Sequence, residues 1–257
     1  MKKVIYALHG FLGLPSDWEL VRKTIHEEKP DWIFVEIDLF HQKEFSTDLS
    51  FEQWTAAFYK WLKNFEDENL KNQNIQRTLV GYSLGGRLAL HLLQENPEYW
   101  AGSVFISTNP GLINESEKLQ RFENDRQWAN KFLNQNFSLT LKEWNSQSVF
   151  QSGFEPERKE VNYDKNLLAS ALLNWSLALQ KDFRVLMDLW NVRQIWVAGE
   201  KDKKFSQILK TLPECQDIQR WEVEGASHRL IFEAPEEIAH FIIRVSMPPI
   251  PIQTVGQ

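Results

Sequence analysis

One serine lies within a glycine-rich turn, and the residues around it suggest that it takes part in a chemical reaction. Ser83 lies in the stretch GYSLG, residues 81–85, which matches the G-x-S-x-G pattern of a nucleophile elbow. An apolar run typical of a strand precedes the turn, and an apolar run with helical spacing follows it. The glycines suit a sharp turn in which the serine backbone is strained. A structural glycine-rich turn is the alternative, but the strand–turn–helix context favours a reactive serine.

A carboxylate and a histidine follow in the order that this chemistry requires, each after a predicted strand. Asp202 lies in WVAGEKDKKF and His228 lies in VEGASHRLIF. Glu200 competes with Asp202, but Asp202 lies farther into its loop, where a side chain can reach a histidine. The alternative role for His228 is to cap a loop. Four other histidines lie in predicted helices or a loop and are expected at the surface or in packing: His26, His41, His91 and His240. We therefore predict a catalytic triad of Ser83, His228 and Asp202.

A second glycine turn, LHGFLG at residues 8–13, follows an early predicted strand. Such a turn can present a backbone N–H opposite the elbow, with His9 and Gly10 setting its shape. The Phe11 and Leu84 N–H groups would then form an oxyanion hole, aided by the positive end of the helix that begins after Ser83. A plain tight turn is the alternative, and its pairing with the elbow favours the functional interpretation.

Short apolar runs alternate with helical patterns around these residues. The predicted strands cover residues 3–10, 31–39, 76–83, 100–110, 192–202 and 217–228. The predicted helices outside the central region cover residues 51–65, 84–97 and 235–246, with Ser50 as a candidate N-cap of the first. This alternation predicts an α/β fold with a mostly parallel sheet and helices on both faces.

Between residues 111 and 188 the pattern is helical without an intervening strand, as expected of an inserted lid. We therefore predict an α/β core over residues 1–110 and 189–247 and a helical lid over residues 111–188. The proline-rich end, residues 248–257, is predicted to be a flexible tail.

Composition excludes several classes of function. The formal net charge of −6 argues against nucleic acid as a partner, although a few local arginines can still bind a small anion. One cysteine, Cys215, excludes an intramolecular disulfide or a CxxC metal site and suits the reducing cytoplasm. The first apolar run is broken by His9 and Gly10, which is unlike a signal peptide, and no run approaches the roughly 20 apolar residues of a membrane span.

No metal-binding cluster, phosphate-binding loop or dinucleotide fingerprint is found in the sequence. We therefore expect no cofactor and no metal. The expected partner is a small-molecule substrate, and the protein is expected to be a cytoplasmic monomer without membrane insertion.

The elbow, the turn at residues 8–13 and the segments around Asp202 and His228 together resemble the α/β-hydrolase superfamily, and the resemblance covers nearly the whole chain. Finer matches occur in the order GYSLGGRLAL, NPGL, RFENDRQWANKFL, EWNSQSVF, SLALQKDFR and GEKDKKF. This set is similar to the 2-succinyl-6-hydroxy-2,4-cyclohexadiene-1-carboxylate (SHCHC) synthases of menaquinone biosynthesis. The DRQW segment lies in the predicted lid, where general esterases share little, so it is more specific than the elbow. The resemblance implies a lyase that eliminates pyruvate from a polycarboxylate, with the triad serine as a general base.

A polycarboxylate substrate would explain why an arginine, Arg87, is placed close to Ser83. It follows Ser83 by four residues, so its side chain can lean back toward the start of the helix. A multiply charged carboxylate substrate needs guanidinium groups near the reacting carbon, whereas a buried arginine would be an unpaired cost in an esterase for neutral acyl groups. The alternative is that Arg87 points outward and pairs with a surface carboxylate. By resemblance, Arg121 and Trp144 complete the substrate contacts, and Tyr82 flanks the serine.

The sequence also departs from the family pattern. Lys165 occupies the place of an expected further substrate arginine, and an ammonium keeps the charge but loses the bidentate fork. Arg126 of DRQW has an equal claim to a structural role, holding the lid through Asp125. The stretch DLFHQKEFST, residues 38–47, lacks the glycine-histidine-glycine turn of many superfamily members.

Two rival functions remain open from the sequence. A carboxylesterase or thioesterase would use the same triad through an acyl-enzyme, and neither the fold nor the triad separates it from a lyase. A non-catalytic binding protein on a hydrolase scaffold would leave function unchanged when Ser83 is replaced by alanine.

Overall fold

The computed structural model describes residues 1–71, 73–150 and 154–248. Its centre is a six-stranded parallel sheet with the strand order β2-β1-β3-β4-β5-β6. The strands are β1 (Lys2–Leu8), β2 (Ile33–Ile37), β3 (Ile75–Tyr82), β4 (Gly102–Ile106), β5 (Gln194–Gly199) and β6 (Ile218–Val223). Every residue of β4 and β5 is buried, as expected of parallel strands that are covered on both faces. The predicted α/β fold is confirmed.

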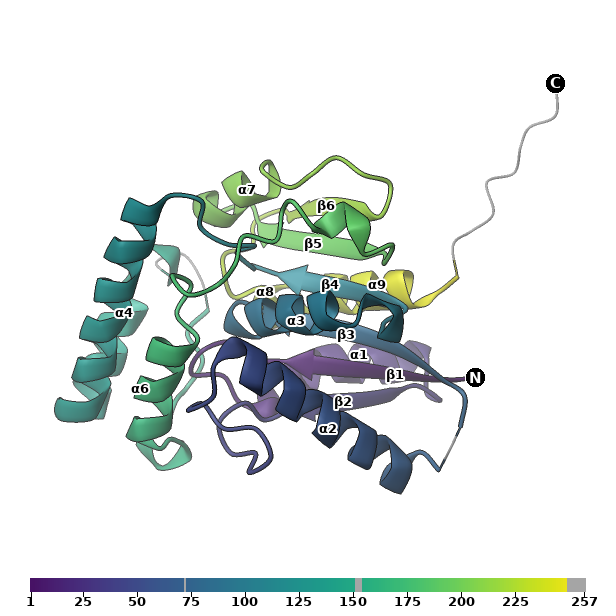
Figure 1. Ribbon diagram of the computed structural model, residues 1–257, viewed down its shortest axis with the longest axis horizontal. Helices are drawn as coiled ribbons and strands as arrows, with labels where there is room; N and C mark the ends of the chain where they lie inside the picture. Colours follow the sequence, from purple (N-terminus) through teal and green to yellow (C-terminus); the bar gives the residue numbers. More distant parts are fainter. Residues whose placement is uncertain (72, 151–153, 249–257) are drawn as a thin grey trace.

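Helices cover both faces of the sheet (Figure 1). On one face lie α2 (Phe51–Asn69) and α3 (Leu84–Glu95), and on the other lie α1 (Glu19–Glu28), α8 (Leu230–Glu233) and α9 (Pro235–Ser246). The short helix α7 (Lys203–Leu209) packs beside β5. Ser50 caps α2 as predicted, because its side chain accepts a hydrogen bond from the Gln53 N–H.

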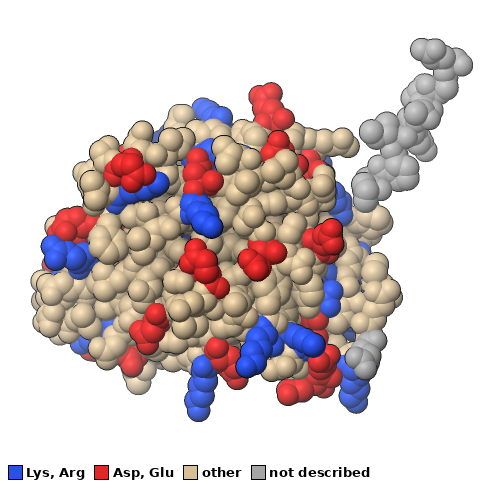
Figure 2. All heavy atoms as spheres, in the orientation of Figure 1, with Lys and Arg blue, Asp and Glu red and all other residues tan. Residues whose placement is uncertain are grey.

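Charged side chains of both signs are intermixed over the face shown in Figure 2, in keeping with the modest net charge of −6. No helix in the part of the chain described by the structure is long and apolar enough to cross a membrane.

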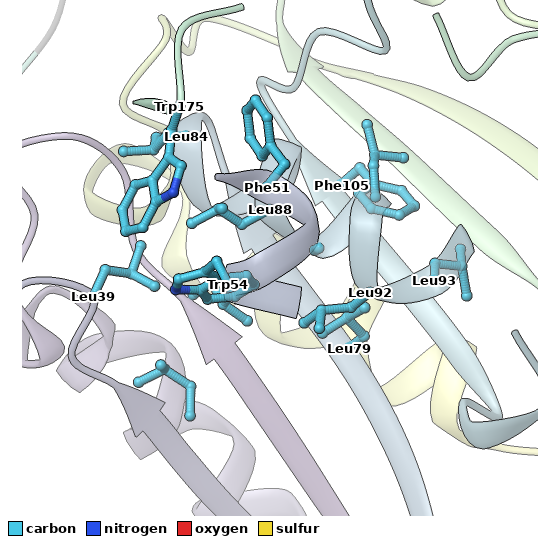
Figure 3. Packing of buried hydrophobic residues seen from close by; sticks show 14 of the residues in the cluster. Leu39, Phe51, Trp54, Leu79, Leu84, Leu88, Leu92, Leu93, Phe105 and Trp175 are labelled. Carbon is cyan, nitrogen blue, oxygen red and sulfur yellow. The ribbon is translucent and has the colours of Figure 1, made fainter. Parts of the chain in front are cut away.

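Apolar side chains form one core on each face of the sheet. Figure 3 shows part of the core on the α2–α3 side, where Phe51 and Trp54 of α2 face Leu88 and Leu92 of α3. Trp175, which follows the helix α6 (Lys165–Asn174) of the predicted lid, packs into the same core beside Leu84. The predicted lid is therefore joined to the core at the point where α3 begins.

The direction in which the chain crosses the sheet reverses between β1 and β3. β2 lies on one side of β1, whereas β3 and every later strand lie on the other side. Leu8 at the end of β1 is paired with Gly81 near the end of β3, so the two glycine turns leave the sheet side by side. In open α/β sheets, ligands bind at such a switch point, outside the carboxyl ends of the strands.

Three longer helices lie between β4 and β5, namely α4 (Glu115–Asn134), α5 (Phe137–Asn145) and α6 (Lys165–Asn174). The described residues 107–150 and 154–193 contain no strand, which agrees with the helical pattern in the sequence. α4 packs against α6, and both lie beyond the carboxyl ends of the strands (Figure 1). Their action as a lid stays a prediction. The predicted flexible tail, apart from residue 248, lies outside the described residues.

Candidate active site

Ser83 lies in the sharp turn between β3 and α3. Its φ of 52° and ψ of −109° are strained for a residue with a side chain, and its N–H donates to the Ile106 carbonyl at 2.9 Å. A Cβ on Gly85 would overlap the carbonyl oxygens of Leu8 and His9, and one on Gly86 would overlap the Thr108 side chain. Glycines are thus required here because the turn lies in close contact with the chain at the ends of β1 and β4.

The three predicted triad residues lie in one hydrogen-bonded row. His228 Nε2 lies 3.2 Å from Ser83 Oγ, and His228 Nδ1 lies 2.7 Å from Asp202 Oδ2. The other Asp202 oxygen accepts from the Phe205 N–H at 3.3 Å as the N-cap of α7, which fixes the carboxylate. Since Nδ1–H faces the carboxylate, Nε2 is left to accept the hydroxyl proton of Ser83.

Glu200, the competing carboxylate, is directed elsewhere. It is exposed, and its carboxylate accepts from the Gly225 N–H at 3.0 Å. Asp202 and His228, by contrast, are buried. The sequence argument for Asp202 over Glu200 agrees with this placement.

The turn after β1 is held against Ser83. A Cβ added to Gly10 would lie 3.5 Å from the Ser83 Cβ, so this loop approaches the serine closely. The buried His9 ring accepts from the Leu39 N–H at 3.1 Å and donates from Nδ1 to the Gly10 carbonyl at 2.8 Å. Burial lowers the pKa of His9, which keeps the ring neutral and able to make both bonds. His9 therefore shapes the loop, as predicted.

Two backbone N–H groups next to Ser83 are available to an oxyanion. Leu84 is the first residue of α3, where an N–H has no partner within the helix. Phe11 lies in the turn after β1, and within the described ranges neither N–H donates to another protein group. Both residues line a cavity together with Ser83. This is the arrangement expected of an oxyanion hole.

Two cavities meet at Ser83. The first, which we call the Arg87 cavity, is lined by residues that include Phe11, Ser83, Leu84, Arg87, Arg121 and Trp144. The second, the Arg229 cavity, is lined by residues that include Phe11, Tyr82, Ser83, Trp144, Arg158 and Arg229. Trp144 belongs to both and packs on Phe11, with ring centroids 4.8 Å apart. The serine can thus be reached by a ligand with a part in each cavity.

Arg87 faces the cavity and not the solvent. Its side chain is buried, with a residue exposure of 9%, and it donates to the Trp175 carbonyl at 2.6 Å. Burial, followed by the charge of Arg121, lowers the pKa of Arg87 to about 9, so the guanidinium is still charged at neutral pH. The alternative in which Arg87 points outward and pairs with a surface carboxylate is wrong.

Arg121 reaches the same cavity from α4. It forms an ion pair with the buried Asp125 at 2.8 Å, and Asp125 also accepts from the Ser176 hydroxyl at 2.7 Å. Arg126 instead pairs with Glu123 on the exposed side of α4. The suggestion that Arg126 holds the lid through Asp125 is therefore wrong, because Arg121 takes that place.

Most of the chain is similar in sequence to known proteins. The sequence profile of the alpha/beta hydrolase family matches residues 5–241. The chain belongs to the alpha/beta hydrolase family. Relatives named 2-succinyl-6-hydroxy-2,4-cyclohexadiene-1-carboxylate synthase in Escherichia coli O1:K1 / APEC and in Escherichia coli strain SMS-3-5 / SECEC are 30% and 31% identical to it. Each comparison extends over 222 residues, which is 83% of this chain and 83% of the relative.

Solved structures with the alpha/beta hydrolase fold superpose well on this one. MenH from S. aureus has a TM-score of 0.78 and 21% identity, covering 95% of this chain and 92% of that chain. A malate-bound thermophilic esterase from Thermogutta terrifontis has a TM-score of 0.69 and 15% identity, covering 96% of this chain and 91% of that chain. At these identities the likeness shows the fold alone.

One predicted substrate residue of this alpha/beta hydrolase is not brought to the site. Lys165 begins α6, pairs with Glu160 at 2.7 Å, and lines neither cavity at Ser83. A different cation, Arg158, lines the Arg229 cavity, where it makes a buried bidentate pair with Asp17 at 2.8 and 2.6 Å. The sequence prediction of Lys165 as a substrate contact is therefore not supported by its placement.

The sequence reasoning missed three further cations that line these cavities: Arg158, Arg229 and Lys204. Arg229 directly follows His228 and is buried, with bonds to the Phe154 carbonyl and the Asn145 side chain at 2.9 and 2.6 Å. Its position next to the triad histidine was the available signal. Arg158 lies in a segment without a recognisable motif.

The loop at residues 38–47, which lacks a glycine-histidine-glycine turn, is filled by aromatic side chains. Phe40 packs on His9 and Phe11, with ring centroids 5.5 and 6.2 Å away, and Phe45 is fully buried. The loop thus supports the turn after β1 from behind.

Within the described residues, no group of three or more His, Cys, Asp or Glu side chains is arranged to hold a metal ion.

Proposed function

We propose that this protein is an SHCHC synthase, a lyase that eliminates pyruvate from 2-succinyl-5-enolpyruvyl-6-hydroxy-3-cyclohexene-1-carboxylate in menaquinone biosynthesis. The observation that carries the proposal is Arg87, a buried guanidinium that lines the same cavity as Ser83 and forms no ion pair with a carboxylate in the part of the chain that the structure describes. A buried cation of this kind is costly unless an anionic ligand binds it. The SHCHC synthase relatives, at 30% identity, support the same assignment.

The two chemical names define the bonds that change. The substrate has a C3–C4 double bond and an enolpyruvyl ether at C5, whereas the product is a 2,4-diene without the ether. The C2–H bond breaks, and its electrons form the C2–C3 double bond. The former C3–C4 pair then forms the C4–C5 double bond, and the C5–O bond breaks. Enolpyruvate leaves, takes up a proton and becomes pyruvate.

In this proposal Ser83 is the base. His228 takes the hydroxyl proton through Nε2 while Asp202 stabilises the resulting imidazolium, and the Ser83 alkoxide removes the C2 proton. The succinyl carbonyl next to C2 accepts the developing charge, and the Phe11 and Leu84 N–H groups donate to that oxygen. The imidazolium then returns its proton to the departing enolpyruvate. No bond forms between Ser83 and the substrate.

A serine base requires positive surroundings because an alkoxide is otherwise too costly at neutral pH. Ser83 precedes α3, so the N-terminal end of that helix dipole is directed at its side chain. Arg87 and Arg121 add two guanidinium groups to the cavity. In the proposal these arginines hold substrate carboxylates, with Trp144 and Tyr82 beside the ring.

We further propose a cytoplasmic monomer that needs no cofactor, in which the thiol of Cys215 suits a reducing compartment.

An ester hydrolase is the competing function, since a Ser–His–Asp row also supports an acyl-enzyme. The deciding assay follows pyruvate release from the enolpyruvyl substrate with coupled lactate dehydrogenase, and hydrolysis of p-nitrophenyl acetate in parallel. The proposal predicts pyruvate release with negligible ester turnover. Rapid ester hydrolysis without pyruvate release would overturn it.

A further inference from the structure

The Arg87 cavity shares four lining residues with a neighbouring cavity. A wider cavity, which we call the outer cavity, is lined by residues that include Gly111, Leu112, Glu117 and Arg184. Its volume is about 620 Å³, against about 90 Å³ for the Arg87 cavity. Both cavities are lined by the same four residues: Asn109, Arg121, Leu177 and Lys204. A ligand that reaches Ser83 from the outer cavity must pass these side chains.

Lys204 differs from the other cations around this junction. Arg121 is paired with Asp125, and Arg184 is paired with Asp182 at 2.6 Å. Lys204 makes neither a hydrogen bond nor an ion pair with any residue in the described ranges, and its ammonium lies 5.8 Å from the centroid of the Phe205 ring. Its charge is therefore available to a ligand.

The charges around the Arg87 cavity are unbalanced without a ligand. Its lining contains three cations, Arg87, Arg121 and Lys204, and one carboxylate, Asp125, which leaves two positive charges. Lys204 is exposed to solvent as a residue, but desolvation by its surroundings, followed by the charge of Arg121, lowers its pKa, and Arg87 acts in the same direction. Asp202 and Asp125 oppose this shift but do not bond to Lys204. Like charges held this closely are stabilised when an anion binds among them.

We propose that Lys204 binds a carboxylate of the substrate at the junction of the Arg87 cavity and the outer cavity, so that the substrate reaches Ser83 through the outer cavity. The identity of the substrate rests on the proposed function. That substrate has three carboxylates, one each on the ring, the succinyl arm and the enolpyruvyl arm. Arg87 and Arg121 supply two binding positions, and Lys204 supplies a third. An ammonium on a flexible stem suits the outermost position, where a charged group must be captured and then released.

Lys204 offers a clean test because, among the described residues, its substitution leaves no hydrogen-bond or ion-pair partner unsatisfied. In Lys204→Met the charge is lost while the aliphatic stem stays, and in Lys204→Arg the charge stays. Lys203→Met is the matched control, since Lys203 is exposed like Lys204 and lies one residue away on α7, but lines none of these cavities. For each protein we would measure KM and kcat for pyruvate release, and the Kd of tricarballylate by calorimetry. The salt dependence of kcat/KM would be measured from 20 to 300 mM.

We expect Lys204→Met to raise both KM and the tricarballylate Kd by about tenfold, with kcat changed less than about threefold, because one charge-assisted contact is lost. The decrease of kcat/KM with salt should be weaker than in the wild type. Lys204→Arg should restore most of the binding, and Lys203→Met should match the wild type. Unchanged KM and Kd in Lys204→Met, or equal losses in Lys203→Met, would overturn the inference.

The two readouts separate this inference from the proposed function. If pyruvate is not released but Lys204→Met still weakens tricarballylate binding, the carboxylate site stands and the lyase assignment fails. If pyruvate is released and Lys204→Met changes neither KM nor Kd, the lyase assignment stands and the role of Lys204 fails. Inorganic phosphate bound as tightly as tricarballylate would contradict a site for carboxylates.

Discussion

Arg87 lies one helical turn after Ser83 on α3, and the two side chains line the same cavity. The strained turn that exposes the serine hydroxyl also starts the helix that directs the guanidinium back toward it. Because Arg87 is held by the Trp175 carbonyl, the segment that follows α6 fixes its position. The reactive group and the proposed anion site are thus set by a single turn of helix.

Replacing Arg87 should separate lyase chemistry from any ester hydrolysis. We expect Arg87→Ala to lower kcat/KM for pyruvate release by at least about 100-fold, because a desolvated charge-assisted contact to a carboxylate is lost. Arg87→Lys should lose about tenfold, since the ammonium keeps the charge but not the bidentate geometry. Hydrolysis of p-nitrophenyl acetate, if present, should be similar in all three proteins. A parallel loss of both activities would show that Arg87 acts on the fold of the elbow.

The two neighbouring carboxylates after β5 should differ sharply in effect. Asp202→Asn should lower kcat by roughly 1000-fold, because an amide no longer orients His228 or stabilises its imidazolium. Glu200→Gln is the matched control and should keep kcat within about twofold, as surface substitutions do. Steady-state kinetics of both variants, with circular dichroism to verify folding, measures this. Equal losses in the two variants would contradict the assignment of Asp202.

Gly85 should tolerate no side chain. In Gly85→Ala the new Cβ would overlap the Leu8 and His9 carbonyls, which are backbone atoms that cannot rotate away. We expect a loss of about 1–3 kcal/mol in the free energy of unfolding, and loss of activity as the turn after β1 moves from Ser83. Gly225→Asn is the control, since Gly225 has a φ of +71°, which asparagine tolerates, and no atom within 4 Å of an added Cβ. Urea unfolding of both variants checks this, and a stable, active Gly85→Ala protein would contradict the close approach.

His91 should make the protein less stable in mild acid. Burial lowers the pKa of His91 to about 3 from its usual 6.5, and its ring stacks on Phe51 at 4.1 Å between centroids. Because the folded pKa lies below the unfolded one, unfolding takes up a proton below pH 6.5, so stability is full above that pH and falls as the pH is lowered. Between pH 7.5 and pH 5 the wild type should lose about 2 kcal/mol more than His91→Leu.

Urea unfolding at the two pH values measures the His91 effect. His26→Leu, on the surface side of α1, is the control and should follow the wild type. A His91→Leu protein with the same acid sensitivity as the wild type would show that this ring is not the cause.

Motifs with fixed geometry could be predicted from the sequence, whereas contacts between distant segments could not. The elbow, the turn after β1 and the order Ser83, Asp202, His228 each follow a strand, so their meeting at one edge of the sheet is a consequence of parallel topology. Arg158 lies in the segment between α5 and α6, and Lys204 follows Asp202 at the start of α7. Both line these cavities only together with residues from the segment between β4 and β5. No local pattern encodes this placement.

The error at Asp125 has a simple helical reason. Arg126 is adjacent in sequence and therefore points to a different side of α4, whereas Arg121 is four residues earlier and lies on the same side. The spacing rule was available from the sequence once α4 was known to be helical. The misplacement of Lys165 is different in kind, because its distance from Ser83 depends on how α6 packs.

The isotope effect at C2 of the substrate tests the central claim most directly, namely that Ser83 removes a proton and does not attack a carbonyl. Substrate with deuterium at C2 and ordinary substrate would be compared in single-turnover experiments with the wild-type protein, following formation of the diene. We predict slower diene formation from the deuterated substrate and no covalent adduct in the intact mass of the quenched protein. Equal rates, together with an adduct that Ser83→Ala lacks, would contradict the account.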